Sequence, residues 1–423
     1  MVSVNTSCNF ISIFAKGTDW RDISKAALEA FDSLSTDNKK FNIGFLYVSD
    51  VLSDDLNSIL NLFKSVTRIQ NWTGCVAVGV IANGEMCFAE PGLAVMVGSI
   101  DEDNFKIFQS QGTGEHGLDY VLSEWSSESE PFLTLVHGDP MSQIDPGHSL
   151  TQVEQKIQGF LVGGLSSSRF ENFQIANGIV QNDISGVVFN HNVKAMTALS
   201  QGCRPIAESH TVTRCVDNKI IELDDQKAFD VFTNDLKNMA VEKIGKNADR
   251  LITETRDIEN PDDFPEELKN LFRGEIHMAF PVIGSDQQDY LVRNILGIDP
   301  ENGFIATPHN IVKGDRVVFV QRDQKTVSED LCKSLLTLRE RVLKENDGKI
   351  PQAAIYVSCV ARASQPGAGF ISGEEESEET SVQSELACIR EILGEIPMIG
   401  FYASGEISNA KLYGYTGVII LFL

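Results

Sequence analysis

Basic residues are scarce in this sequence. Its 423 residues include 35 Lys and Arg against 60 Asp and Glu, which gives a formal net charge of −25 at pH 7. A nucleic-acid-binding surface needs clustered positive charge to neutralise phosphates. The charge balance therefore argues against a nucleic-acid partner and is typical of a soluble protein whose molecules repel one another.

Long apolar runs and a basic leader are also missing. No Lys or Arg precedes Lys16, and the longest apolar end of the chain is the short run of residues 418–423. A membrane-spanning helix needs about 20 apolar residues. We therefore expect no signal peptide, no membrane association and a cytoplasmic location.

The eight cysteines include no Cys-Xaa-Xaa-Cys pair, and most lie within apolar runs, as Cys75 does. This arrangement indicates reduced, mostly buried thiols rather than a disulfide framework. No group of His, Cys and carboxylate residues has metal-ligand spacing, so we expect no metal.

The chain is too long for a single ordinary core, so we expect two domains. The predicted division is residues 1–224 and 225–423, with a connecting helix and an acidic linker at about 225–270. Many short predicted strands are separated by turn signals such as Asn83-Gly84 and Asn177-Gly178, which favour hairpins. We predict an α/β (α+β) fold of mixed, largely antiparallel sheets flanked by helices, in a four-layer αββα arrangement.

One order of elements occurs three times: a strand, a helix, a strand containing glycine, and a hairpin. The glycine-containing strands are predicted at residues 74–81, 160–168 and 398–407, with Gly74, Gly163 and Gly400 in equivalent places. The pattern predicts a structural duplication.

Several short segments carry a family resemblance. In chain order, they are Gly74-Cys75-Val76-Ala77-Val78-Gly79, Val162-Gly163-Gly164, Gln201-Gly202-Cys203-Arg204-Pro205, Thr211-Val212-Thr213, Tyr290-Leu291-Val292-Arg293, Ser358-Cys359-Val360-Ala361-Arg362 and Gly400-Phe401-Tyr402-Ala403-Ser404-Gly405-Glu406-Ile407, with Thr416 near the end. In these segments the chain resembles the FIST domain proteins (F-box and intracellular signal transduction), which carry an N-terminal and a C-terminal FIST region.

The resemblance implies a sensory module that binds a small molecule, with amino acids a common suggestion, and signals to a protein partner. Some bacterial members look like haem-dependent nitric oxide sensors. The sequence shows no F-box or output domain, which argues against a ubiquitin-ligase role. It also has Tyr413-Gly414-Tyr415 before Thr416, where relatives often show His and Asn.

The candidate ligand site lies at the ends of the glycine-containing strands. If these strands lie side by side, their ends bring Ser166, Ser404 and Glu406 to one edge, where Gly and Ser loops make anion-binding concavities. Arg293 and Arg362 can each grip a carboxylate, and Glu406 can accept from an ammonium group, which together fit a zwitterion such as an amino acid. The predicted ligand-binding residues are Ser166, Arg204, Arg293, Cys359, Arg362, Ser404, Gly405 and Glu406.

Four other interpretations stay open. Arg362 and Glu406 could simply pair with each other across strand ends. Cys359, or Cys203 beside Arg204, could be an activated nucleophile, although neither has a histidine next to it in sequence, and we expect no enzyme activity.

The remaining two concern a cofactor and a partner. Haem is an alternative cofactor, because seven histidines are available, of which His137 and His210 lie next to predicted strands. The chain could also be an interaction scaffold whose acidic loop at residues 373–379 attracts a basic partner.

Overall fold

The computed structural model describes residues 1–34, 40–112, 114, 117–125, 130–248, 275–282, 289–322, 324–363 and 379–423. They belong to two compact units that interleave along the chain. Unit 1 comprises Met1–Ser200, Leu331–Ala363 and Val382–Leu423, and unit 2 comprises Gln201–Asp330 and Ser364–Ser381. The acidic linker falls largely outside the described residues, and so does the acidic loop except Glu379.

The described residues of unit 1 form three sheets. Sheet 1 is β1 (Val2–Thr6), β2 (Phe10–Lys16), β7 (Gly92–Gly98), β3 (Ile43–Ser49), β4 (Asn71–Ala77), β11 (Gln174–Ala176) and β12 (Ile179–Val180). Sheet 2 is β8 (Phe105–Gln109), β13 (Ile184–Asn190), β9 (Pro131–Gly138), β10 (Phe160–Leu165), β26 (Glu406–Ser408) and β27 (Lys411–Tyr413). Sheet 3 is β14 (Ala195–Ser200), β28 (Gly417–Phe422), β24 (Ala353–Cys359), β25 (Met398–Ala403), β5 (Gly79–Ala82) and β6 (Glu85–Phe88).

Each sheet is built around one strand–helix–strand unit whose two strands are parallel. These units are β3–α2–β4, β9–α4–β10 and β24–α9–β25. Each is preceded by a further helix. The helices are α1 (Trp20–Leu34), α2 (Leu56–Thr67), α3 (Leu118–Ser123), α4 (Pro146–Ile157), α8 (Gln324–Glu345) and α9 (Glu379–Leu393). The order of elements is the same in all three, so the predicted duplication is confirmed, and we call the units repeats 1, 2 and 3.

The hairpin that follows each unit leaves its own sheet. β5–β6 of repeat 1 joins sheet 3, β26–β27 of repeat 3 joins sheet 2, and β11–β12 of repeat 2 joins sheet 1. The exchange is cyclic, and it breaks two strands that the sequence predicts as continuous. Residues 74–81 divide at Val78, and residues 398–407 divide at Ser404 and Gly405. The apolar pattern does not reveal these breaks because both halves of each segment are buried.

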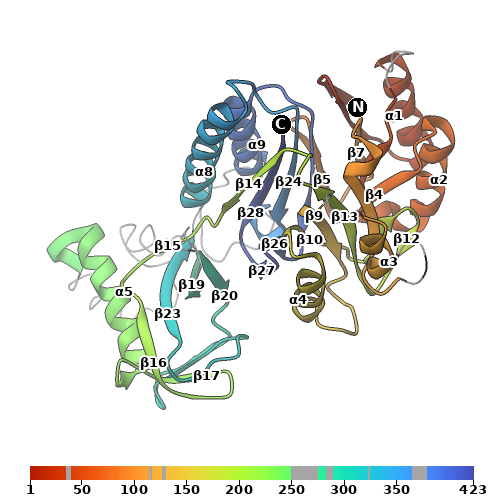
Figure 1. Ribbon diagram of the computed structural model, residues 1–423. Helices are drawn as coiled ribbons and strands as arrows, with labels where there is room; N and C mark the ends of the chain where they lie inside the picture. The colour runs from red at the N-terminus through yellow and green to blue at the C-terminus, as the bar shows by residue number, and fades with distance from the viewer. Residues whose placement is uncertain are drawn as a thin grey trace. The chain divides into compact units, whose positions relative to one another are not determined.

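The sheets of unit 1 share one core and carry helices on their outer faces (Figure 1). The shared core includes Phe45 of sheet 1, Val187 of sheet 2 and Phe401 of sheet 3, all without exposed surface. Outside it, α1 and α2 cover sheet 1, α3 and α4 cover sheet 2, and α8 and α9 cover sheet 3. The α+β class, with mixed sheets flanked by helices, is therefore confirmed, and three sheets share the core of unit 1.

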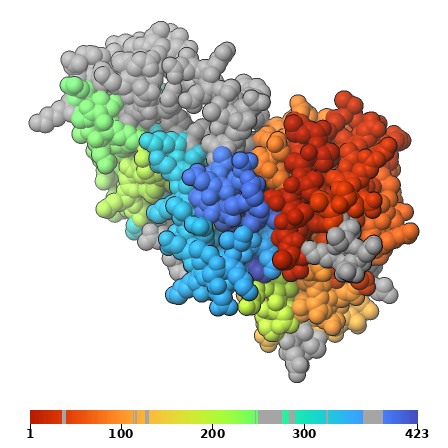
Figure 2. Space-filling view, turned by 90° about the horizontal axis from the view of Figure 1, so that it is seen from above, coloured from red at the N-terminus to blue at the C-terminus, as the bar shows by residue number. Residues whose placement is uncertain are grey.

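Distant parts of the sequence lie side by side in unit 1. Antiparallel pairing of β5 with β25 joins the N-terminal and C-terminal thirds, and Asn5 Nδ2 donates to Ile396 O at 3.1 Å. Figure 2 shows the red N-terminal residues against the blue C-terminal ones. The third repeat is thus integral to the same body as the first.

In the residues of unit 2 that the structure describes, one long helix accompanies a largely antiparallel nine-stranded sheet. Its elements are β15 (Arg204–Pro205), β16 (His210–Val216), β17 (Lys219–Leu223), β18 (Gln226–Lys227), α5 (Ala228–Ile244), β19 (Glu275–Pro281), β20 (Tyr290–Arg293), β21 (Gly297–Asp299), β22 (Phe304–Ala306) and β23 (Arg316–Arg322). α5 packs on the sheet through Phe232, whose ring centroid lies 4.8 Å from that of Phe319. The chain enters unit 2 after β14, so the larger segment of this unit is inserted between β14 and β24, ahead of repeat 3.

One expectation about cysteine is wrong. Cys332 of α8 and Cys388 of α9 form a disulfide within unit 1, whereas the other six cysteines are free thiols. The two helices lie side by side on sheet 3, which brings together residues 56 positions apart in sequence. Among the described helices, none is long and apolar enough to cross a bilayer.

Candidate functional site

The ends of the three glycine-containing strands meet in unit 1, although the strands belong to three different sheets. Ala77 forms a parallel bridge with Ser167. Leu165 N donates to Gly405 O at 2.8 Å, and Ser404 N donates to Leu165 O at 3.1 Å. The predicted convergence is present, but the assumption of one common sheet is wrong, because each strand crosses to the next sheet at this point.

The serine residues at the junction differ in their surroundings. Ser166 is fully buried, and its Oγ donates to Gly138 O at 3.1 Å. Ser167 Oγ accepts from Val78 N at 3.1 Å and donates to Tyr402 O. Ser404 is exposed. These hydroxyls hold the strand ends together, and only Ser404 faces solvent.

Beside the junction lies a set of buried polar side chains that we call the polar cluster. It joins residues from β14, β24, the turn after β24, α9, β26 and the residue before β28. Its members are Ser200, Tyr356, Cys359, Arg362, Glu385, Glu406 and Thr416, each exposing 7% of its surface or less. Three predicted residues, Cys359, Arg362 and Glu406, are among them. They come together because sheets 2 and 3 exchange strands here.

Arg362 is paired inside the polar cluster. Its Nε lies 3.0 Å from Glu385 Oε1, and its Nη1 donates to Ser200 O at 3.1 Å. Tyr356 Oη donates to Glu385 Oε2 at 2.8 Å. Although burial alone lowers it, the neighbouring Glu385 carboxylate raises the pKa of Arg362. The ion-pair partner is thus Glu385, and the alternative of an Arg362–Glu406 pair is wrong.

The two carboxylate oxygens of Glu406 differ in their hydrogen bonding. Its Oε2 accepts from Thr416 N at 3.0 Å and from Thr416 Oγ1 at 2.8 Å. Its Oε1 has no hydrogen-bond partner among the described residues. Burial raises the pKa of Glu406 to about 7, although the Thr416 donors, the Cys359 thiol and the Arg362 charge act in the opposite direction. Among the described residues, this buried carboxylate therefore has the Thr416 donors on one oxygen and at most the weak Cys359 thiol on the other.

Cys359 is a buried thiol next to that carboxylate. Burial, with the Glu406 charge nearby, raises the pKa of Cys359 to about 12. A thiol with this pKa is protonated near neutral pH and supplies little of the thiolate that nucleophilic catalysis needs. Arg362 does not counter this effect, because its charge is directed at Glu385.

Two predicted residues, Arg204 and Arg293, belong to unit 2. Arg204 is exposed on β15, which pairs with β23. Arg293 ends β20, its Nη1 donates to Val292 O at 2.8 Å, and burial lowers its pKa. The structure therefore brings together the predicted residues of unit 1 and assigns the two remaining arginines to the other unit.

The histidines proposed for haem are engaged by other side chains. His137 has no exposed surface, lies 3.2 Å from Tyr47 Oη through Nε2, and lies 3.4 Å from Thr73 Oγ1 through Nδ1. Burial lowers the pKa of His137 to about 3. His210 contacts a carboxylate through each ring nitrogen. Neither ring offers a free nitrogen to a haem iron, so these two positions do not fit the cofactor.

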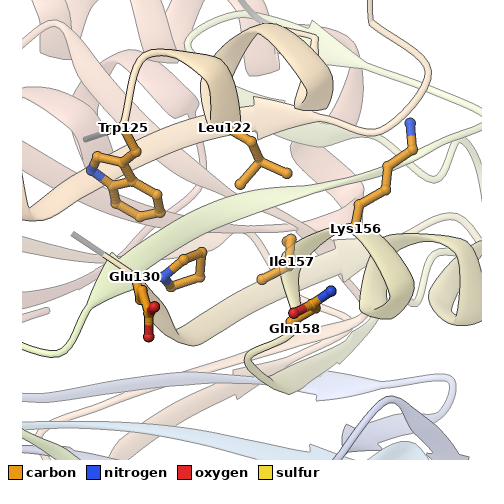
Figure 3. Close-up of a pocket in the computed structure, with 7 residues that line it drawn as sticks. Leu122, Trp125, Glu130, Lys156, Ile157 and Gln158 are labelled. Atoms are coloured by element: carbon orange, nitrogen blue, oxygen red, sulfur yellow. The ribbon is translucent and has the colours of Figure 1, made fainter. Parts of the chain in front are cut away.

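A separate cavity of about 400 Å³ lies at the other end of the β9–β10 pair (Figure 3). It is lined by Leu122 and Trp125, by Glu130 and Pro131 at the start of β9, and by Lys156, Ile157 and Gln158 at the end of α4. The polar cluster lies beyond the opposite end of the same strands, since Glu406 pairs with Gly164 of β10. None of the predicted site residues lines this cavity.

The sequence did not predict four members of the polar cluster, including the carboxylate that pairs with Arg362. Glu385 follows an acidic run at residues 373–379 and reads as a surface residue, yet it is 4% exposed. Ser200 and Tyr356 lie in apolar strands without any functional signal. Thr416 belongs to the resemblance segments but carries no role there. Only the strand pairing of sheet 3 places these residues around Arg362.

Comparisons with known proteins agree with this architecture. The FIST N domain matches residues 42–226 and the FIST C domain matches residues 252–409. An uncharacterized protein of Mycobacterium tuberculosis is 25% identical over 369 residues, covering 83% of each chain. An uncharacterized protein of Mycobacterium bovis is 24% identical over 393 residues, covering 89% of this chain and 88% of its own. The chain belongs to the FIST family, whose domains are sensory domains of signal transduction.

Proposed function

We propose that the chain is a non-catalytic cytoplasmic sensor that binds a small ligand at the polar cluster and signals to a protein partner. The observation that carries this proposal is Glu406 Oε1, a fully buried carboxylate oxygen for which the part of the chain that the structure describes supplies no donor stronger than the Cys359 thiol. A buried polar atom without a partner costs roughly 1–3 kcal/mol. A ligand that brings a hydrogen-bond donor to this oxygen recovers that free energy.

The charges of the cluster favour a ligand with an amino group. Two carboxylates, Glu385 and Glu406, face one guanidinium, Arg362. An ammonium group bound to Glu406 would balance the second carboxylate. A ligand carboxylate could then take the place of Glu385 on Arg362, because a guanidinium presents several N–H donors in a planar fork that matches a carboxylate. An amino acid or similar zwitterion carries both groups.

Burial of the cluster links binding to a change in structure. Arg362 and Glu406 expose 1% and 0% of their surface, so a ligand must displace a covering side chain to reach them. Glu385 is the candidate, because it lies on α9 and holds Arg362 directly. Displacement of Glu385 would shift α9 on sheet 3. A ligand that favours the shifted state changes the population that a partner recognises.

A ligand screen by thermal unfolding tests the proposal. A true ligand raises the unfolding midpoint progressively, because its stabilisation grows with the logarithm of its concentration above Kd. We expect at least one amino acid or small amine to stabilise the wild-type protein and not the Glu406→Gln variant. Glu391→Gln, an exposed substitution on α9, is the matched control and should respond as the wild type does. Equal responses of the wild type and Glu406→Gln, or no response to any compound, would refute the proposed site.

A further inference from the structure

The first helix of repeat 2 is much shorter than its counterparts. α3 has 6 residues, whereas α1 has 15 and α8 has 22. Val136 and Leu46 hold equivalent register positions opposite Gly163 and Gly74, which makes Pro131 the equivalent of Phe41.

In repeat 1 the space next to this position is filled by the helix. Phe31 of α1 lies with its ring centroid 5.9 Å from that of Phe41. In repeat 2 the residue equivalent to Phe41, Pro131, lines the open cavity of about 400 Å³. The cavity is therefore the space that a longer helix occupies elsewhere in the same architecture. Its volume falls within the range typical of small-molecule sites.

The accessible lining of the cavity is more polar than apolar, with an apolar and aromatic part at Leu122, Trp125 and Pro131 and charged side chains at the rim (Figure 3). Trp125 and Leu122 lie on one wall, and Pro131 contributes further apolar surface. Figure 3 shows Glu130 and Lys156 on opposite sides of the cavity. A small aromatic or aliphatic group can pack on this apolar part, and the polar groups of the ligand then meet the polar lining and the rim.

The rim favours a positive charge. Lys156 Nζ is already paired, at 2.7 Å from Asp119 Oδ1. Glu130 has no ion-pair partner among the described residues and is exposed. The 12-residue helix α4 ends at the cavity, with Gln158 in the left-handed conformation, so the negative end of its dipole lies there. The Trp125 ring adds a face that attracts cations.

We propose that this cavity binds a small organic cation with an aromatic or aliphatic body, such as an arylalkylamine. The body packs against Trp125 and Leu122, while the ammonium group meets Glu130 and the carbonyl end of α4. The site is independent of the one proposed at Glu406, which lies beyond the other end of the β9–β10 pair.

Three ligands that share a phenyl ring but differ in charge test this proposal. Phenethylamine is the cation, 2-phenylethanol the neutral analogue and phenylacetate the anion. In calorimetric titrations of the full-length protein we expect phenethylamine to bind at least tenfold more tightly than 2-phenylethanol, and phenylacetate not to bind. Equal affinity for the first two, or no phenethylamine binding at millimolar concentration, would overturn the proposal.

Substitutions locate the binding. Glu130→Gln should weaken phenethylamine binding about tenfold, and Glu391→Gln should leave it unchanged. Glu130 is exposed, so its substitution keeps the fold; Trp125→Ala should abolish binding. Glu406→Gln must not affect phenethylamine affinity. If Glu406→Gln weakens binding and Glu130→Gln does not, the ammonium group binds the polar cluster, and the cavity proposal is wrong.

Discussion

Gly163 lies directly against the backbone of Val136. A Cβ atom at Gly163 would stand 1.9 Å from the Val136 carbonyl oxygen, far inside van der Waals contact. Gly74 and Gly400 have the same relationship with the strand beside them, also at 1.9 Å. Each repeat therefore brings its parallel strands together at a position where no side chain fits.

Gly163→Ala should be severely destabilising. The backbone of β9 cannot move aside without disturbing sheet 2, and Gly163 has φ of +143°, which other residues rarely adopt. We expect a loss of about 3 kcal/mol or more in the free energy of unfolding, measured in urea. Gly178→Ala is the matched control, because nothing lies within 4 Å of its Cβ position. Similar losses for both variants would contradict this account.

Removing one partner of the Arg362–Glu385 pair should cost more than removing both. Arg362→Met leaves the Glu385 carboxylate buried without its counter-charge, which typically costs about 3–5 kcal/mol. The double variant Arg362→Met/Glu385→Leu leaves no uncompensated charge and should recover a large part of that loss. Urea unfolding of both single variants and the double variant measures the coupling. Additive losses would show that the two side chains act independently.

Glu406 should make stability fall as pH rises. Its pKa is about 7 when folded against an ordinary value of 4.5, so the folded protein holds the proton more tightly. This stabilisation is complete below pH 4.5 and is lost as pH rises to 7, a change of about 3 kcal/mol. Glu406→Gln lacks the titrating group. The free-energy difference between wild type and variant should therefore change across this pH window, and a constant difference would count against a buried Glu406.

His210 should titrate above its ordinary pKa of 6.5. Its Nδ1 lies 2.7 Å from Asp224 Oδ2 and its Nε2 lies 2.8 Å from Asp235 Oδ2. Burial lowers the pKa of His210, but the hydrogen bonds and charges of the two carboxylates raise it by more, so the net shift of the pKa is upward. The stabilisation is complete below pH 6.5 and is lost as pH rises through the raised pKa.

NMR titration of histidine ring protons measures this pKa directly. Asp235→Asn should lower the pKa of His210, because it removes one of the two carboxylates. Asp230→Asn, an exposed substitution on the same helix, should leave it unchanged. An unchanged His210 pKa in Asp235→Asn would show that the contact does not persist in solution.

The Cys332–Cys388 disulfide should be detectable by counting thiols. Alkylation after unfolding should label six cysteines without reductant and eight with it. Closure of a loop of this length restricts the unfolded chain by about 4 kcal/mol in the chain-entropy treatment, so reduction should lower the unfolding midpoint. The Cys332→Ser/Cys388→Ser variant should not respond to reductant. Eight labelled cysteines without reductant would rule out the disulfide.

The sequence supported the repeats because their signals are local. The glycine positions, the helix between parallel strands and the Asn83-Gly84 turn all follow from neighbouring residues. The pairing of β14 with β28 joins residues more than 200 positions apart, and no local pattern encodes it. For the same reason Glu406 could be predicted as a polar strand end, whereas Glu385 as the partner of Arg362 could not.

The cyclic hairpin exchange makes each repeat depend on another for one edge of its sheet. An isolated repeat would leave β4, β10 or β25 without its outer neighbour, and would carry a hairpin with nothing to pair against. Such a fragment has one unpaired strand edge and one unpaired hairpin. The hairpin of one copy can pair with the strand edge of another copy. A single excised repeat is therefore expected to assemble as a closed trimer. The full chain would then correspond to this trimer with its three repeats joined in one polypeptide.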